Sequence, residues 1–262
     1  MQPFAYQQAA SLADALKAAS APGARFLAGG QSLLPAMKLG LSAPDALVDL
    51  GAIAELRSIS AGKGVVTIGA MATHASVAES QAVRDAIPAL AALAGNIGDR
   101  QVRNRGTIGG SLANNDPAAD YPAAVLGLGA TVQTDRRTIA ADNFFKGLYE
   151  TALAEGEIIT AVSFPVPTKA GWQKFKQPAS RFSLVGVFVA LTAQGPRVAV
   201  TGAGPCAFRV KALEDKLATT WSPASCDAVK IDAGGLNTDL HGSAEYRAAL
   251  IPVLARRAVA AA

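Results

Sequence analysis

The order of apolar and polar residues changes its period several times along the chain, and each change predicts an element. Residues 9–20 carry apolar side chains at helical spacing, and Ser11 is suited to cap their N-terminus. Short apolar runs at 24–28 and 46–50 predict strands. Together these elements predict a small β-α-β-like unit within residues 1–58.

A second series of elements follows. An apolar run at 64–73 predicts a strand that enters a turn, and a helical pattern then continues on both sides of Pro88. A helix leading to a strand is predicted over 122–135, and the run at 158–166 predicts a further strand. These elements predict an α/β subdomain over residues 59–168.

Pro165, Pro167 and Gly171 mark a boundary after that strand. The order of strands followed by helices beyond it predicts a separate α+β domain at 169–262, after a first domain at 1–168. The strand and helix patterns of this last domain lie at 171–177, 183–193, 197–204, 209–219 and 243–261.

Two pairs of adjacent glycines are the clearest candidates for function. Gly29 and Gly30 stand in AGGQS, and Gly109 and Gly110 stand in TIGGSLANNDPAAD, each after an apolar, strand-like stretch. Adjacent glycines let backbone N–H groups point into one concavity, and such nests hold phosphate oxygens. Two nests in one domain suit a diphosphate and hence a dinucleotide, although plain turns are the alternative. Neither pair has the GxGxxG or GxxxxGK[ST] signature.

Polar side chains follow the second pair closely. Asn114, Asp116 and Asp120 lie near the predicted phosphate, and the Ser32 hydroxyl belongs to the first glycine pair. A carboxylate repels phosphate but accepts well from a ribose or ribityl hydroxyl. Asp116, which precedes a proline, is as well suited to cap a helix.

Basic residues leave several interpretations open. Arg100, Arg103 and Arg105 form either a solvated face, counter-charge for a diphosphate, or a contact with a partner subunit. Lys176 either faces solvent from its strand or lies beside a ring system that becomes negative on reduction. His74 is most simply explained as a loop or cap residue.

Composition excludes several classes of function. The chain has 262 residues and a net charge of +4 with scattered basic residues, which does not indicate nucleic-acid binding. No apolar run approaches the length of a transmembrane helix, and we expect no signal peptide. Two cysteines are too few for a four-thiolate cluster, and two histidines argue against a multi-histidine metal site. Chemistry carried by a bound cofactor is therefore favoured.

Three stretches carry a family resemblance: FLAGGQSLLPAMKL at 26–39, QVRNRGTIGGSLANNDPAADYP at 101–122 and FKQPASRFSLVGVFVAL at 175–191. Nearly the whole chain resembles the FAD-binding medium subunit of the xanthine dehydrogenase and carbon monoxide dehydrogenase family of molybdenum hydroxylases. The resemblance implies an α+β protein. It consists of a PCMH-type FAD-binding domain of two α/β subdomains and a small CO dehydrogenase flavoprotein-type C-terminal domain.

The resemblance also implies which residues bind a non-covalent FAD. The two glycine segments would hold the diphosphate from opposite sides, and Asp120 would hold a sugar hydroxyl. Ile97 would pack on the adenine, while Ile159 and Lys176 would lie near the isoalloxazine. The complete set of expected FAD-binding residues is Ala28, Gly29, Gly30, Gln31, Ser32, Leu33, Ile97, Thr107, Ile108, Gly109, Gly110, Ser111, Asn114, Asp120, Ile159 and Lys176.

By the same resemblance the molybdopterin–molybdenum centre and the [2Fe–2S] clusters belong to a large and a small partner subunit. We expect a cytoplasmic dimer of heterotrimers, with no catalytic or metal-binding residue on this chain. Electrons would pass from the clusters through FAD to a terminal acceptor. Two alternatives remain: a self-contained PCMH-type flavin oxidoreductase, and a non-enzymatic nucleotide-binding module.

Overall fold

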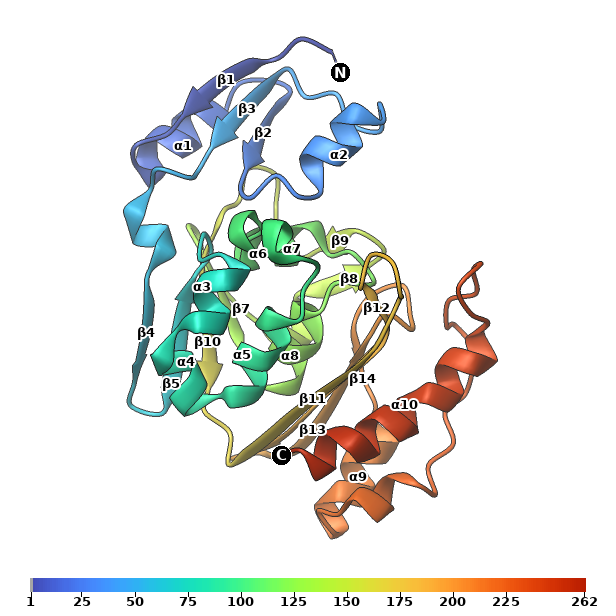
Figure 1. Ribbon diagram of the computed structural model, residues 1–262. Helices are drawn as coiled ribbons and strands as arrows, with labels where there is room; N and C mark the ends of the chain where they lie inside the picture. The colour runs from blue at the N-terminus through green and yellow to red at the C-terminus, as the bar shows by residue number, and fades with distance from the viewer. Residues whose placement is uncertain (1) are drawn as a thin grey trace.

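The computed structural model in Figure 1 describes residues 2–262. The chain folds into three units, each of helices packed on a sheet, which follow one another from blue through green to red. The N-terminal unit is a parallel three-stranded sheet of strand order β1-β3-β2 with two helices. Its elements are β1 (Ala5–Gln8), α1 (Leu12–Ala19), β2 (Ala24–Leu27), α2 (Leu33–Lys38) and β3 (Ala46–Asp49). The Ser11 hydroxyl accepts from the Asp14 N–H at 3.1 Å, so the predicted cap of α1 is present.

The middle unit is built on an antiparallel five-stranded sheet of strand order β4-β5-β10-β6-β7. Its strands are β4 (Ile59–Gly62), β5 (Val65–Gly69), β6 (Thr131–Thr134), β7 (Thr138–Ala140) and β10 (Ile159–Pro165), with a separate hairpin of β8 (Phe145–Gly147) and β9 (Glu150–Thr151). Its helices are α3 (His74–Glu79), α4 (Gln81–Ala86), α5 (Pro88–Gly95), α6 (Arg100–Arg105), α7 (Ile108–Asn114) and α8 (Tyr121–Gly127), with 3-10 turns η1 (Ala54–Arg57) and η2 (Ala141–Asn143).

The helices of the middle unit differ from the sequence prediction in two places. Pro88 begins α5 as expected, but Ser80 adds a second break, because its extended backbone ends α3 and its hydroxyl caps α4. The stretch before the second glycine pair is not strand-like. It forms α6, whose first turn is capped by the Asp99 carboxylate accepting from the Val102 N–H at 2.8 Å.

The C-terminal unit is an antiparallel four-stranded sheet of strand order β11-β12-β13-β14 that carries α9 and α10 on one face (Figure 1). Its elements are β11 (Lys169–Lys176), β12 (Ser183–Thr192), β13 (Gly195–Thr201), β14 (Phe208–Arg209), α9 (Lys211–Thr219), η3 (Pro223–Cys226) and α10 (Ala244–Ala260). The Ser243 hydroxyl caps α10 by accepting from the Tyr246 N–H at 3.2 Å.

Strand β12 is buried on both faces and joins two cores. Val185, Val187 and Val189 pack with α9 and α10, whereas Phe188 and Ala190 pack with the helices of the middle unit. Because successive side chains of a strand point to opposite faces, this arrangement requires a nearly continuous apolar run. The middle unit and the C-terminal sheet therefore share one packed interface.

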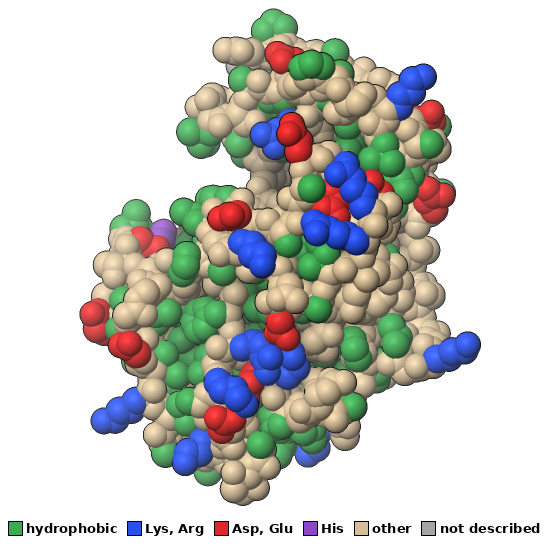
Figure 2. All heavy atoms as spheres, turned by 180° about the vertical axis from the view of Figure 1, so that it is seen from behind, with side chains coloured by type: hydrophobic (Ala, Val, Ile, Leu, Met, Phe, Trp, Pro, Cys, Tyr) green, Lys and Arg blue, Asp and Glu red, His purple; other side chains and the backbone are tan. Residues whose placement is uncertain are grey.

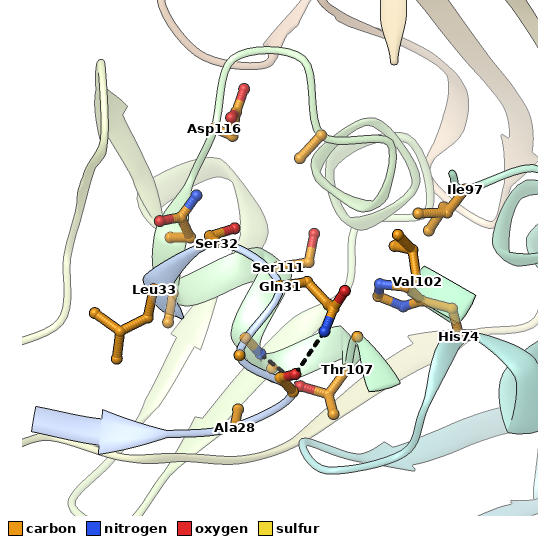
Figure 3. Close-up of a pocket in the computed structure, with 18 of the residues that line it drawn as sticks. Ala28, Gln31, Ser32, Leu33, His74, Ile97, Val102, Thr107, Ser111 and Asp116 are labelled. Carbon is orange, nitrogen blue, oxygen red and sulfur yellow. Dashed lines mark hydrogen bonds between the residues drawn. The ribbon is translucent and has the colours of Figure 1, made fainter. Parts of the chain in front are cut away.

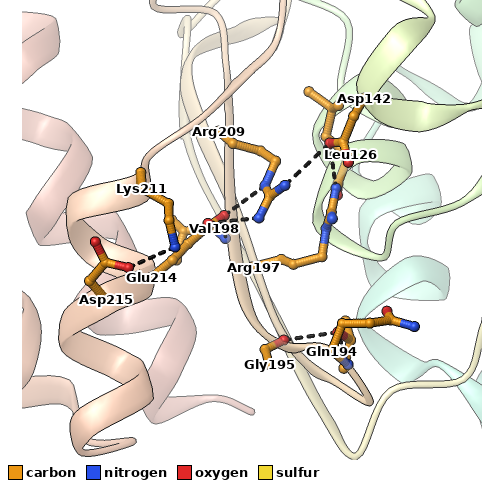
Figure 4. A network of polar contacts seen from close by, with 11 residues as sticks. Leu126, Asp142, Gln194, Gly195, Arg197, Val198, Arg209, Lys211, Glu214 and Asp215 are labelled. Atoms are coloured by element: carbon orange, nitrogen blue, oxygen red, sulfur yellow. Dashed lines mark hydrogen bonds and ion pairs between the residues drawn. The ribbon is translucent and has the colours of Figure 1, made fainter.

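Charged side chains reinforce the edge of that interface (Figure 4). The Arg197 guanidinium donates to the Leu126 carbonyl at 2.7 Å and to the Asp142 carboxylate at 2.6 Å, which ties β13 to the end of α8 and to η2. Arg209 on β14 pairs with the buried Glu214 of α9 at 2.7 Å. These contacts fix the sheet that contributes one wall of the site described next.

Candidate functional site

A cavity of about 520 Å³ lies between the N-terminal unit and the other two units. The back view in Figure 2 shows the molecule hollowed beneath its upper lobe, and Figure 3 shows the side chains that line the cavity. Of the predicted site residues, all but Ile108 and Lys176 contribute to its walls. Ile108 is instead fully buried in the core of the middle unit. The volume falls in the range of small-molecule and cofactor sites.

The first glycine segment, residues 28–33, is a loop with free backbone donors. It turns through Gly30, whose φ of +73° lies in the left-handed region that glycine adopts without strain. Among residues 2–262, the amides of residues 29–33 donate no hydrogen bond to the protein. Backbone N–H groups inside a folded protein are almost always paired. These donors are therefore available to a ligand in the cavity.

The second glycine segment, residues 107–111, begins a helix and is not the loop that the sequence predicted. Thr107 is the N-cap of α7, and its hydroxyl accepts from the Gly110 N–H at 3.1 Å. The Gly109 N–H donates to the Ala70 carbonyl at 2.8 Å. The amides of Ile108 and Ser111 likewise have backbone acceptors. This segment faces the cavity through side chains and Cα atoms. Its N–H groups beyond Thr107 donate hydrogen bonds within the protein.

Glycine at these positions also allows the segments to approach their neighbours. A Cβ on Gly29 would lie 2.0 Å from the Arg105 carbonyl oxygen, at the end of α6. A Cβ on Gly109 would lie 2.6 Å from the Ala70 Cβ and 2.7 Å from the Ala70 carbonyl oxygen. Real Cβ atoms do not approach backbone so closely. The missing side chains thus bring the first segment against α6 and bring α7 against the end of β5.

A buried ion pair closes the wall formed by the C-terminal sheet. The Asp120 carboxylate accepts from Lys174 Nζ at 2.5 Å and from Ser183 Oγ at 2.6 Å. The side chains of Asp120 and Lys174 are each 3% exposed. Burial raises the pKa of Asp120, and its contacts with Lys174 and Ser183 oppose that rise. Asp120 thus lies in the cavity wall, and Lys174 is a charged neighbour that sequence reasoning missed.

Lys176 occupies a different place from Lys174. Its Nζ donates to Asn96 Oδ1 at 2.7 Å, and its side chain is exposed outside the cavity walls. Lys174 Nζ also donates to the Asn96 carbonyl oxygen, at 3.2 Å. Two lysines of strand β11 therefore bond the end of α5, and of these Lys174 lines the cavity.

His74 is a further wall residue whose position the sequence did not predict. It is the first residue of α3, is 5% exposed, and packs against the Tyr121 ring with centroids 5.4 Å apart. Burial, aided by the charge of Arg103, lowers the pKa of His74 to about 4. The imidazole is therefore neutral at physiological pH, beside the apolar side chains of Ile97 and Val102 (Figure 3).

The groups that line the cavity fit a dinucleotide such as FAD. The amides of the first glycine segment and the Ser111 hydroxyl are donors suited to phosphate oxygens. Asp120 retains acceptor capacity for a sugar hydroxyl, since an ionised carboxylate has about four acceptor positions. Ile97 and Ile159 offer apolar surface to rings.

Comparison with known proteins decides the family. Residues 2–167 match the family described as the FAD binding domain in molybdopterin dehydrogenase. The chain belongs to this family. It is 38% identical to the nicotine 6-hydroxylase medium subunit of Paenarthrobacter nicotinovorans over 97% of this chain and 95% of that protein. It is also 35% identical to the carbon monoxide dehydrogenase medium chain of Hydrogenophaga pseudoflava, over 91% of this chain and 89% of that one.

Solved structures agree with this assignment. Quinoline 2-oxidoreductase from Pseudomonas putida 86 superimposes with a TM-score of 0.90 at 31% identity, covering 100% of this chain and 97% of that chain. Carbon monoxide dehydrogenase from Hydrogenophaga pseudoflava gives 0.90 at 34% identity, covering 100% and 98%. The predicted family and α+β fold class are confirmed. The protein is an FAD-binding oxidoreductase subunit.

Within this FAD-binding protein the arginines near the second glycine segment are structural or exposed. Arg103 donates to the carbonyls of Ile97 and Gly98, each at 3.1 Å, and so closes the turn before α6. Arg100 and Arg105 are exposed and do not line the FAD cavity. The cavity is instead lined by Arg25 and Arg181, which sequence reasoning did not select.

Glu157 is another wall residue of the FAD-binding protein that the sequence did not reveal. Its carboxylate accepts from two nitrogens of Arg137, each at 2.9 Å, and from the Ala154 N–H at 2.7 Å. The Arg137 contact lowers the pKa of Glu157 to about 2. Glu157 therefore stays ionised and holds the chain that leads into Ile158 and Ile159.

Other chemistry-bearing residues lie apart from the FAD cavity. Cys206 and Cys226 are free thiols. Across residues 2–262, no three histidine, cysteine or acidic side chains converge as a metal site requires. No helix in this described part combines the length and the apolar character needed to cross a bilayer.

Proposed function

We propose that this chain is the FAD-carrying electron-transfer subunit of a molybdenum hydroxylase complex. It would receive electrons from [2Fe–2S] clusters of a partner subunit and deliver them to a terminal acceptor. FAD, when bound, can accept electrons singly and release them as a pair, which couples one-electron clusters to a two-electron acceptor. The observation that carries the proposal is the row of free amides at residues 29–33, which lines the cavity of a confirmed FAD-binding family member.

The chain's own residues bind and orient the cofactor. We assign the diphosphate to the free amides of residues 29–33 and to the side chains of Thr107 and Ser111. Asp120 accepts from a sugar hydroxyl, and Ile97 packs on the adenine. Ile159 lies toward the isoalloxazine. Lys176, whose side chain is exposed outside the cavity walls and bonds Asn96, is given no contact with the ring. The binding domain spans 1–168 and the flavoprotein-type C-terminal domain spans 169–262.

The molybdenum and iron–sulfur centres are assigned to partner chains. The sequence holds two cysteines, fewer than one four-thiolate cluster needs. Relatives bear the names medium subunit and medium chain, and one solved neighbour is named a Cu,Mo-CO dehydrogenase. The carbon monoxide dehydrogenase structure from Hydrogenophaga pseudoflava is described as lacking the Mo-pyranopterin moiety of its molybdenum cofactor. We propose a large molybdopterin subunit and a small [2Fe–2S] subunit, assembled as a dimer of heterotrimers. Two free thiols suit the reducing cytoplasm.

Purification from the native host tests this proposal. A tag on this chain should recover a complex with one large and one small partner, with iron, molybdenum and the absorption bands of FAD. Light scattering should give the mass of two heterotrimers. Acid precipitation should leave the yellow colour in the supernatant, because the proposed binding is non-covalent.

Three outcomes would contradict it. Flavin retained in the acid pellet would indicate a covalent link, for which His74 is the histidine in the cavity wall. Full turnover by this chain alone, without metals, would indicate a self-contained flavin oxidoreductase. A colourless protein that binds adenine nucleotides but not FAD would indicate a nucleotide-binding module.

A further inference from the structure

We propose that Lys174 is a positioning residue that keeps the Asp120 carboxylate ionised and oriented toward the cavity as an acceptor for a cofactor hydroxyl. This inference rests on the proposed FAD site and assigns Lys174 no contact with FAD itself. Lys174 is distinct from Lys176, which is the lysine that the family resemblance indicates.

Three elements converge on the Asp120 side chain. Asp120 immediately precedes α8, Lys174 reaches it from β11, and Ser183 reaches it from the start of β12. Ser183 occupies Oδ1 and Lys174 occupies Oδ2. One acceptor position on each oxygen is thereby used, and the carboxylate keeps others for a ligand. Both Asp120 and Lys174 line the cavity, so the pair lies at the boundary with any bound molecule.

Lys174 is itself held in place from the other side. Its Nζ donates to the Asn96 carbonyl at 3.2 Å as well as to Asp120. The ammonium thus bridges the end of α5 and the residue before α8, which fixes its distance from the carboxylate. A lone buried carboxyl would lose its charge, because burial penalises the ionised form. The ammonium offsets that penalty directly.

Two titratable side chains near Asp120 keep one charge state between pH 6 and pH 9. Burial keeps Tyr121, the next residue, in its neutral form by raising its pKa. The pKa of His74, which packs on Tyr121, is lowered to about 4 by burial and Arg103. Ser183 does not titrate, and Lys176 on β11 bonds Asn96 Oδ1 and not Asp120. A change of FAD affinity within this range therefore reports Asp120.

The sign of the effect follows from these contacts. Without the Lys174 ammonium, burial of Asp120 is opposed only by the Ser183 hydrogen bond and by the charge of Lys176, so the pKa of Asp120 moves further up. Protonation consumes one acceptor position and adds a proton that itself needs a partner. FAD affinity should then be kept at high pH and lost as the pH falls through the raised pKa.

The test is a titration of deflavinated full-length protein with FAD between pH 6 and pH 9. The variants are Lys174→Met, which keeps most of the apolar stem, and Lys176→Met, a lysine on the same strand that does not touch Asp120. For Lys174→Met the midpoint of the pH profile should move up by about one unit or more. The midpoint for Lys176→Met should move up by less than that for Lys174→Met, because Lys176 acts on Asp120 through its charge alone, without a hydrogen bond.

Infrared spectra provide a readout independent of flavin binding. At pH 7, Lys174→Met should show a protonated carboxyl band that is absent from the double variant Lys174→Met/Asp120→Asn. If Lys174→Met does not fold, the double variant is tested in its place. It should fold, because neither position then buries a charge. It should bind FAD about tenfold or more weakly than wild type, with no dependence on pH in this range.

The outcomes separate the two proposals. Wild-type protein that binds FAD, with Lys174→Met sharing its pH midpoint and lacking the carboxyl band, would overturn the role of Lys174 alone. Wild-type affinity in the double variant would do the same. Wild-type protein that binds no FAD at any pH would overturn both this role and the proposed function.

Discussion

The two glycine segments look alike in sequence but differ in whether their backbone amides are hydrogen-bonded within the protein. In residues 28–33 the amides of five consecutive positions, 29–33, have no protein acceptor. In residues 107–111 the amides after Thr107 are bonded within the protein, to a cap and to the end of β5. The first segment offers its backbone to a ligand, whereas the second uses its glycines for close packing and offers side chains. Adjacent glycines alone do not identify a phosphate nest.

The largest effect that follows from this comparison is on stability. Gly109→Ala places a Cβ 2.6 Å from the Ala70 Cβ, so α7 must move away from the end of β5. We expect a loss of about 3 kcal/mol of unfolding free energy. Chemical denaturation of the apoprotein measures it. The matched control is Gly95→Ala in α5, where the new Cβ meets the nearest atom at 3.7 Å and should not destabilise. Equal stability of the two variants would contradict the packing role.

The next effect is on binding. Gly30→Ala should weaken FAD binding about tenfold or more, because the left-handed turn that aligns the free amides becomes strained. Gly40→Ala is the control, since Gly40 has the same φ of +73° and no atom within 4 Å of the new Cβ. Gly30→Ala should lose more stability than Gly40→Ala, because its Cβ would lie 2.9 Å from Leu34 Cδ1, and only Gly30→Ala should lose FAD in a fluorescence titration. FAD binding that Gly30→Ala leaves intact would exclude the first segment as the diphosphate site.

The smallest effect concerns the cap of the second segment. Thr107→Ala removes the acceptor of the Gly110 N–H and should cost about 1 kcal/mol of apoprotein stability. Thr107→Ser keeps a hydroxyl there and should restore most of it. Thermal unfolding of the apoproteins compares the two. Unchanged apoprotein stability in Thr107→Ala would contradict the capping role of Thr107, whatever the effect on FAD binding.

The sequence predicted the glycine pairs but not their difference. Glycine has a low helix propensity, so a helix that begins Ile108–Gly109–Gly110 resembles a loop in any local pattern. The threonine cap before it is a local signal that supports the helix. The hydrogen bond from the Gly109 N–H goes to Ala70, which follows β5 and lies far away in the chain. The sequence around Gly109 therefore gives no local sign of this bond.

The lysines of β11 and the long strand β12 also show that a local sequence pattern predicts elements but not contacts between distant residues. The apolar run of β12 predicted a strand, because that signal is local, whereas the burial of its two faces in different cores appears only in the structure. Lys174 and Lys176 are two positions apart and share a nominal face, yet a register shift separates Phe175 from Lys176 in the pairing with β12. Only the structure shows that Lys174, 54 residues from Asp120, reaches its carboxylate.

Hydrogen exchange of backbone amides, with and without FAD, tests the central claim most directly. Spectra of the full-length protein labelled with 15N-glycine distinguish Gly29 and Gly30 from Gly109 and Gly110. We expect the first two amides to exchange rapidly in the apoprotein and to become protected when FAD binds. The amides of Gly109 and Gly110 should be protected in both states. Protection that appears at Gly109 and Gly110 on FAD binding, with Gly29 and Gly30 unchanged, would contradict the account.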